Sequence, residues 1–427
     1  MSITRRSFVK AGVAVGVGGA TQVGIPSLAT EDAVASGRPE LKVAWEDFCE
    51  RLKQAGDVIF DDAAPETPLE RAEGIRYLSR LIKLGLNLSL EYNDPMFPEL
   101  VRYFGPTLKS GGDNPDAIYL GSRINGAETY RVSGKRGNAG YLVFTILKPT
   151  EGVEGGHAFY GTPLARLQGS ALQSEADGSF ELILSPDEHS GNWLQTAPET
   201  SWFTIRQFFG DWRAEEPMSV TIERVGGEGP PPGLNEERML RALAEAGSFV
   251  GGSAAFWVRF IERYRPETNR FVPHRVSGLD GAPGGVVHHC FWWVEADEVL
   301  LIQVQPVECS FWNFELNNYW MNSVDYRYHV SSINGTQAIP EEDGSVRIAI
   351  AHEDPGIPNW LDTAGFNVGL LNNRWMQAES SPLPDTRLLK LAALPDALPK
   401  DARRISPQGR IEQLRQRRLG IDRRFPP

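Results

Sequence analysis

Two loops in this sequence carry the side chains that acid–base catalysis uses. Residues 187–194 have the sequence "DEHSGNWL", and residues 352–361 have the sequence "HEDPGIPNWL". A carboxylate beside an imidazole can orient the ring, and the ring itself titrates near neutral pH. The second loop follows a strand rich in amides and aromatic rings. We therefore expect His352, Glu353 and Asp354 to form a proton-transfer group.

The strand-like segment at 311–320, "FWNFELNNYW", alternates aromatic side chains with amides and an acid. Rings and amides together bind sugars or planar organic molecules, because the ring stacks on the apolar face while the amide bonds polar groups. A half-buried strand with a polar outer face would produce the same pattern. The side chains expected to position a substrate are Asn317, Tyr319, Trp320, Asn359, Trp360, Arg374, His189 and Trp193. Among them, Arg374 could neutralise a developing anion.

Turn chemistry is the alternative explanation for both loops, since Asp and Ser commonly bond nearby backbone amides. Comparison of the loops helps to separate the two explanations. The histidine follows the acids in the first loop and precedes them in the second, while Asn-Trp-Leu keeps its place in both. This favours a structural role for Asn-Trp-Leu and leaves at most one loop catalytic.

Metal and cofactor chemistry have little support. In "HHCFWWVE" (288–295), His288 and His289 would face opposite sides of a regular strand. His329 and His352 could join one of them at a metal, but no HxH or HxxxH spacing supports such a site. The sequence also lacks a Walker loop, a dinucleotide GxGxxG after a strand, a GxSxG elbow and an HExxH motif. We therefore expect no metal and no cofactor.

Charge and composition limit the partners. The chain has 427 residues and a net charge of −12, which argues against binding to nucleic acid, because phosphate recognition needs a basic surface. The basic segment at 410–424 is interpreted as the solvated face of a helix. The expected partner is a small organic ligand or substrate, and a homo-oligomer is left open. The three cysteines permit one optional bridge, between Cys290 and Cys309.

The N-terminus is similar to a twin-arginine export signal. "TRRSFVK" (4–10) precedes the short apolar run "AGVAVGVGGA" (11–20), and small residues at 33–35 or 27–29 offer a cleavage site. The apolar run is too short and too rich in glycine to span a bilayer. The sequence therefore predicts a periplasmic or secreted protein. It would engage the twin-arginine translocation machinery and would not insert stably into a membrane.

Hydrophobic periodicity places these loops on an alternating order of helices and strands. Helical spacing covers 41–92, with a capping box at Thr67 and Glu70, and returns over 234–264 and 406–424. Short period-two runs begin at Ala117, and Asn-Gly in "INGAE" predicts a hairpin turn. The expected segments are a signal peptide (1–35), a helical segment (36–112), a first β-domain (113–226), a linker with helices (227–270), a second β-domain (271–405) and a helical tail (406–427).

An internal repeat joins the two β-domains. "DGSFELIL" at 177–184 returns as "DGSVRIAI" at 343–350, and each is followed by Asn-Trp-Leu. The strand pairs at 128–147 and 297–316 stand at nearly the same spacing. The fold class predicted is therefore α+β and mainly β. It would have two tandem antiparallel jelly-roll-like or sandwich domains with N-terminal, inter-domain and C-terminal helices.

The quoted loops, together with "DNPDAIYLGSRINGAETYRVSG" (113–134) and "FGDW" (209–212), resemble bacterial proteins with the domain of unknown function 1214. The resemblance covers most of 113–406. It implies β-rich domains and no established reaction, so the site must be argued from chemistry. Our first hypothesis is an exported, cofactor-free acid–base enzyme acting on a glycoside, an aromatic or a terpenoid. The alternatives are a ligand-binding or envelope-interaction protein without catalysis, and a metal-dependent jelly-roll enzyme.

Overall fold

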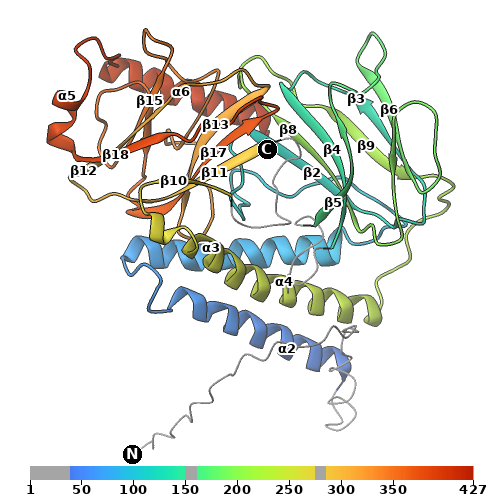
Figure 1. The fold of residues 1–427 in the computed structure, drawn as a ribbon. Coiled ribbons are helices and arrows are strands. Elements are labelled where there is room, and N and C mark those ends of the chain that lie inside the picture. The colour runs from blue at the N-terminus through green and yellow to red at the C-terminus, as the bar shows by residue number, and fades with distance from the viewer. Residues whose placement is uncertain (1–38, 150–160, 275–284, 427) are drawn as a thin grey trace, which may run out of the picture.

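The computed structural model describes residues 39–149, 161–274 and 285–426. The expected export signal, residues 1–35, lies outside these residues. The described chain is mainly β and forms two tandem sandwich-like domains above a layer of helices (Figure 1). None of its helices contains a stretch long and apolar enough to cross a membrane.

Three helices form the layer that lies beneath both sandwiches: α2 (Glu40–Ala55), α3 (Pro68–Leu86) and α4 (Glu236–Glu262) (Figure 1). The capping box predicted at the start of α3 is present. The Thr67 hydroxyl accepts a hydrogen bond from the Glu70 backbone amide. A 3₁₀ turn, η1 (Gly56–Ile59), follows α2, a π-helical turn, η2 (Asn87–Glu91), follows α3, and a 3₁₀ turn, η4 (Arg265–Glu267), follows α4.

The first sandwich consists of a five-stranded sheet, ordered β1-β2-β8-β4-β5, and a four-stranded sheet, ordered β7-β6-β3-β9. Its strands are β1 (Val101–Arg102), β2 (Ala117–Arg123), β3 (Tyr130–Lys135), β4 (Tyr141–Lys148), β5 (Thr162–Gln168), β6 (Ser179–Ser185), β7 (Trp193–Gln195), β8 (Trp202–Phe208) and β9 (Ser219–Arg224). The core between the sheets is apolar and includes Phe144, Leu182 and Phe203.

The second sandwich repeats this topology strand for strand, in sheets ordered β10-β11-β17-β13-β14 and β16-β15-β12-β18. Its strands are β10 (Phe271–Pro273), β11 (Gly285–Trp293), β12 (Glu298–Val304), β13 (Phe311–Asn318), β14 (Ser332–Asn334), β15 (Val346–Ala351), β16 (Trp360–Asp362), β17 (Val368–Met376) and β18 (Asp385–Lys390). After it come η5 (Leu391–Ala393), α5 (Leu394–Ala397) and α6 (Pro407–Arg424). Because β1 matches β10 and every later strand keeps the same partner, the repeat in the sequence is a repeat of the whole sandwich.

Two sequence-based predictions are corrected here. Asn125-Gly126 does not close a hairpin, because β2 and β3 belong to different sheets and the turn carries the chain between them. The Asn125 side chain accepts a hydrogen bond from the Ala127 amide, so it builds an Asx turn. No disulfide joins the cysteines of the described residues: Cys290 is buried in the second core, and Cys309 is a free thiol before β13.

The basic C-terminal segment also differs from its interpretation as a solvated face. Arg410, Arg417 and Arg424 are spaced by seven residues along α6 and are only 5%, 7% and 1% exposed. Arg410 pairs with Asp354, while Arg417 donates to the carbonyl oxygens of Tyr326 and Ser332. We call these three residues the arginine stripe of α6. Contacts with carbonyl and carboxylate oxygens from distant parts of the chain make their burial possible, and a count of charges along the sequence does not reveal such contacts.

The two five-stranded sheets face one another across the domain interface (Figure 1), where Tyr141 and Phe208 pack against Phe311 and Met376. A buried polar centre lies beside this apolar contact. The Asp116 carboxylate accepts hydrogen bonds from the side-chain nitrogens of Asn313, Asn334 and Trp212 at 2.7–2.8 Å. Two of these partners come from the second sandwich. The domain interface is therefore held by directed bonds as well as by packing.

Candidate functional site

The structure gives the predicted catalytic loop a set of structural contacts. The two ring nitrogens of His352 lie 3.0 Å from the Val294 carbonyl oxygen and 3.1 Å from the Thr363 hydroxyl. Asp354 forms an ion pair with Arg410 of α6, and Glu353 is exposed. These contacts fasten the loop to its surroundings and do not place its carboxylates against the imidazole.

The repeated Asn-Trp-Leu does the same structural work in both sandwiches. Asn359 accepts a hydrogen bond from the Ile339 amide and donates to the carbonyl oxygens of Ile339 and Arg347. Asn192 makes the corresponding three bonds, to both backbone groups of Gln173 and to Glu181. These bonds hold a short loop that returns the chain parallel to the strand it has just left.

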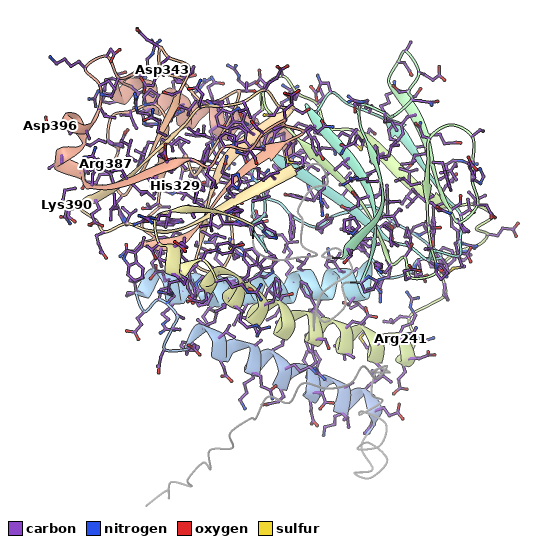
Figure 2. All side chains as sticks on the ribbon, viewed as in Figure 1. Arg241, His329, Asp343, Arg387, Lys390 and Asp396 are labelled. Atoms are coloured by element: carbon purple, nitrogen blue, oxygen red, sulfur yellow. The ribbon has the colours of Figure 1, made fainter. Side chains whose placement is uncertain are left out.

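The residues that flank this asparagine in the repeat also bond to backbone groups at the same places in both sandwiches. The indole nitrogens of Trp193 and Trp360 donate to the carbonyl oxygens of Ser185 and Ala351, each at the end of the preceding strand. In each Asp-Gly-Ser turn the carboxylate accepts a bond from the serine amide, and the glycine has a positive φ. Asp343 of the second turn lies on the outer side of its sandwich (Figure 2). His189 is exposed in the first loop.

Two of the expected substrate contacts instead join the second sandwich to the helical layer. The Tyr319 hydroxyl donates to Glu262 of α4 at 2.6 Å. Trp320 is fully buried, and its indole nitrogen donates to the Glu70 carbonyl oxygen of α3 at 2.8 Å. These bonds account for both side chains as anchors between the layers.

Asn317 and Arg374, by contrast, come together around a buried carboxylate at the domain interface. Glu315 of β13 has no exposed surface and forms an ion pair with Arg374 of β17. Its Oε1 also accepts hydrogen bonds from Asn317, at 2.9 Å, and Asn372, at 3.1 Å. Arg374 further donates to the Gly112 carbonyl oxygen, which belongs to the segment before β2. Burying two charged side chains costs free energy because both lose their hydration. Titratable groups that are buried in this way cluster at functional sites.

A line of hydrogen bonds runs from this carboxylate to two histidines. Asn372 Oδ1 lies 2.7 Å from His289 Nδ1, and His289 Nε2 lies 2.8 Å from His274 Nδ1. We call Glu315, Asn372, His289 and His274 the relay. His288, the neighbour of His289, faces the other side of β11 and contacts the Ser381 carbonyl oxygen, as strand alternation predicts.

The relay determines which nitrogen of each ring carries a proton. The Asn372 amide nitrogen donates to Glu315, so its oxygen faces His289 and must accept a proton from Nδ1. In the neutral ring the lone pair of His289 is then on Nε2, which accepts from His274 Nδ1. The lone pair of neutral His274 is consequently on Nε2, and His274 is half-buried, unlike the other three members.

Burial changes the proton affinity of the inner members. It raises the pKa of Glu315 to about 7, although the nearby Arg374 guanidinium favours the charged carboxylate. Burial, with a smaller contribution from the neighbouring His274, lowers the pKa of His289 to about 3. Phe260 and Tyr264 pack against the His289 ring and keep it dry. His289 is therefore neutral near pH 7, while Glu315 can exchange its proton there.

The sequence contained part of the signal for this site. Alternation along 311–318 places Glu315 and Asn317 on one face, and His289 is singled out in "HHCFWWVE". His274 and Asn372 are missed, because nothing local connects a histidine at the end of β10 with an amide on β17. Within the described residues, no group of three or more His, Cys, Asp or Glu side chains has the geometry to hold a metal ion.

The fold and this interface define a class of protein: tandem β-sandwiches of identical topology on a shared helical layer, with a polar centre between them. The chain belongs to the family described as "Protein of unknown function (DUF1214)", whose sequence model matches residues 119–211 and 299–371. The family match thus spans β2 to β8 and most of β12 to β17. It includes Glu315 of the relay and Asn317, which donates to Glu315.

Two solved structures are similar to this chain to different degrees. The crystal structure of an uncharacterised protein from Burkholderia cenocepacia is 37% identical, with a TM-score of 0.79, over 86% of this chain and 99% of that chain. The VPA0106 protein from Vibrio parahaemolyticus is 11% identical, with a TM-score of 0.44, over 80% of this chain and 100% of that chain. A comparison with curated proteins finds no match.

Proposed function

We propose that this protein is an enzyme that moves a proton on a bulky organic substrate by acid–base catalysis with its own side chains. In this proposal the general base is His274 Nε2, and His289, Asn372 and Glu315 orient the ring. The observation that carries the proposal is the unbroken line of hydrogen bonds at 2.7–3.1 Å from a buried carboxylate to a half-buried imidazole. A base oriented through a second group by a carboxylate is a recurring catalytic arrangement.

Arg374 supports the proposal from the other end of the relay. Its side chain is 12% exposed and its guanidinium pairs with Glu315, so it can stabilise negative charge that develops close to the domain interface. The half-buried Tyr119 of β2 lies in the same interface, and its hydroxyl accepts a hydrogen bond from the Asn114 amide. A substrate bound here would meet cationic and aromatic groups together.

The decisive test is an untargeted metabolite screen with four proteins: wild type, His274→Ala, Asn372→Ala and His352→Ala. Wild type should deplete at least one compound, and His274→Ala should reduce that turnover by at least about a hundredfold. Asn372→Ala should reduce turnover and shift its pH profile, because the ring orientation is lost. If His352→Ala abolishes turnover while His274→Ala leaves it intact, the base is the one expected from the sequence and this assignment is wrong.

A ligand-binding or envelope-interaction protein without catalysis is the second candidate. It is favoured by the fact that Glu315, Asn372 and His289 each have a partner within the interface, as a purely structural network requires. Tight binding of a compound with no product after long incubation would support it. Metal analysis of the purified protein tests the remaining alternative, a metal-dependent enzyme, which requires a stoichiometric ion.

We also propose that the protein is exported folded to the periplasm or beyond by the twin-arginine pathway. Support comes from Arg5 and Arg6, which stand before a weakly apolar run. Replacing both arginines by lysine should retain the protein in the cytoplasm with its signal uncleaved. Fractionation and immunoblotting would check this, and continued export of the double variant would count against the pathway.

A further inference from the structure

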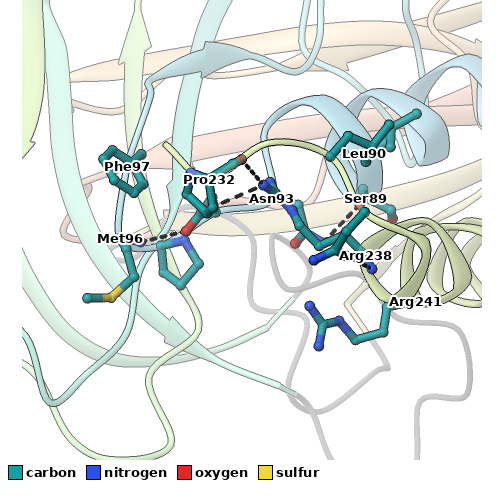
Figure 3. Close-up of a pocket in the computed structure, with 12 residues that line it drawn as sticks. Ser89, Leu90, Asn93, Met96, Phe97, Pro232, Arg238 and Arg241 are labelled. Atoms are coloured by element: carbon teal, nitrogen blue, oxygen red, sulfur yellow. Dashed lines mark hydrogen bonds and ion pairs between the residues drawn. The ribbon is translucent and has the colours of Figure 1, made fainter. Parts of the chain in front are cut away.

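Two adjoining cavities lie where α4 begins, with volumes of about 400 and about 290 Å³. Figure 3 shows the larger of the two. Volumes of this order hold small organic ligands. The side chains that line both cavities are Leu90, Asp94, Phe97, Pro232, Leu234 and Arg238. No member of the relay lines either of them. The cavities are therefore separate from the interface proposed above for catalysis.

Two residues that line the larger cavity, Ser89 and Asn93, carry buried polar atoms without partners. Ser89 is only 1% exposed, and its hydroxyl forms no hydrogen bond in the structure. The Asn93 side-chain oxygen is likewise buried and unpaired, while its nitrogen donates to the Ser89 carbonyl oxygen. Buried polar groups are almost always hydrogen-bonded, so two orphans on one cavity wall indicate a missing donor. Ser89 belongs to the π-helical turn η2, a local irregularity that is frequent at functional sites.

Cationic groups reach the same cavity from α4. Arg238 and Arg241 are one turn apart and so lie on one side of the helix (Figure 3). Arg238 donates to the Pro232 carbonyl oxygen and lies 3.6 Å from the Asp94 carboxylate. Arg241 pairs with Glu237, but both of those side chains are more than half exposed, so the pair contributes little. Arg241 can therefore turn toward an anion in the cavity.

The wall thus offers both signs of charge in a small space, together with an apolar surface. Asp94, which follows Asn93 in the chain, supplies a carboxylate to the lining of the cavity, and Arg238 and Arg241 supply the cations. Met96 and Phe97 line the cavity next to Asp94. A simple anion would leave the Asn93 oxygen without a donor, and a simple cation would leave the arginines unused. The matching ligand carries an ammonium, a carboxylate and an apolar group.

We propose that this cavity binds a free α-amino acid with an apolar side chain. Its ammonium would donate to the Ser89 hydroxyl, the Asn93 oxygen and the Asp94 carboxylate, three acceptors for three N–H groups. Its carboxylate would pair with Arg241 and Arg238 near the positive end of α4. Its side chain would cover Met96 and Phe97.

Calorimetric titration of the purified protein tests this with L-phenylalanine and L-leucine as probes. The matched controls are 3-phenylpropionate, which lacks the ammonium, and phenethylamine, which lacks the carboxylate. Each should bind at least about tenfold more weakly than L-phenylalanine, because one charged hydrogen-bonding group is lost. The proposal is overturned if neither amino acid binds at millimolar concentration, or if either control binds as tightly as L-phenylalanine.

Variants locate the site. Arg241→Gln and Asn93→Ala should each weaken L-phenylalanine binding by about tenfold or more. Arg259→Gln is the matched control, because Arg259 is exposed on the same helix and does not line either cavity. Circular dichroism would verify that each variant is folded. Unchanged affinity in folded Arg241→Gln and Asn93→Ala would place any binding elsewhere and remove this cavity as the site.

Discussion

At the scale of single residues, burial changes the proton affinity of Glu315 and His289 and so makes them candidates for acid–base chemistry. Glu315 and His289 are ordinary members of strands by sequence, but both are withdrawn from water at the domain interface. Desolvation disfavours the charged form of each group, so it raises the pKa of the acid and lowers that of the histidine. His352 has the more suggestive sequence context, yet among the described residues its ring nitrogens bond to a carbonyl oxygen and a hydroxyl and to no carboxylate. The surroundings of a histidine decide its chemistry more than its neighbours in sequence do.

The buried His289 predicts a pH dependence of stability. Its folded-state pKa of about 3 lies below the ordinary value of 6.5, so the unfolded chain binds a proton first as the pH falls. The stabilisation is complete above pH 6.5 and is lost as the pH falls toward 3. Between pH 7 and pH 4, wild type should lose about 3 kcal/mol more unfolding free energy than His289→Gln. Urea unfolding at both pH values measures this, with exposed His189→Gln as the control.

The charged groups around His289 also affect this pH dependence. Arg374 is a cationic neighbour, and His274 and His288 add positive charge beside the ring whenever they are protonated, so all three disfavour a proton on His289. If wild type and His289→Gln lose equal stability on acidification, the ring is not buried in its neutral form. The proposed orientation of His274 would then fail as well, because it depends on a neutral His289.

At the scale of the element, the duplicated loops and α6 have the same physical task, which is to satisfy backbone groups where strands end. A parallel strand pair normally needs a long connection. The loops before β7 and β16 manage with a few residues because an asparagine side chain replaces the missing backbone bonds. In α6 the arginines reach carbonyl oxygens of several loops at once. Polar side chains here substitute for regular secondary structure.

Removing the asparagine should cost different amounts in the two copies. Asn359 is 3% exposed, so Asn359→Ala leaves buried backbone groups unpaired and should lower the unfolding free energy by about 3 kcal/mol. Asn192 makes the same bonds in a more exposed loop, and Asn192→Ala should cost about 1 kcal/mol. Denaturant unfolding of both variants provides the comparison. A larger loss for Asn192→Ala would contradict the role assigned to burial.

The arginine stripe of α6 gives a second prediction at this scale. Arg417→Leu removes the donor to Tyr326 and Ser332 and should lower the unfolding free energy by about 3 kcal/mol. Arg415→Leu is the matched control on the same helix, since its side chain is 61% exposed and pairs only with nearby Glu412 among the described residues. It should change stability by less than about 0.5 kcal/mol. Thermal melts of the two variants should differ clearly, and coinciding melts would show that the stripe is not stabilising.

At the scale of the whole molecule, two similar sandwiches are joined into one unit. The helical layer contacts both sandwiches, and α6 donates hydrogen bonds to both. Asp116 accepts hydrogen bonds from side chains of both domains. Each sandwich has its own apolar core. Two separate cores do not require the sandwiches to unfold together. Cooperative unfolding of the whole molecule must therefore come from contacts at the domain interface.

Differential scanning calorimetry can test this coupling. Wild type should unfold in one transition. Asp116→Ala removes an acceptor that three buried donors share, so it should lower stability by about 3 to 5 kcal/mol and split the transition in two. Asp116→Asn keeps one side-chain oxygen and should have a smaller effect. A single transition at the wild-type temperature for Asp116→Ala would show that the polar centre does not couple the domains.

Local sequence patterns were enough to predict the fold class, the order of helices and strands, and the family. Those properties depend on local periodicity, capping residues such as Thr67, and the repeat of Asp-Gly-Ser with Asn-Trp-Leu. The comparison of the two loops also pointed to a structural asparagine. Three features follow from the folded chain alone. Arg417 is buried, β2 and β3 belong to different sheets, and the ring nitrogens of His274 and His289 form a hydrogen bond. These facts depend on contacts between segments far apart in the chain, and local periodicity carries no information about them.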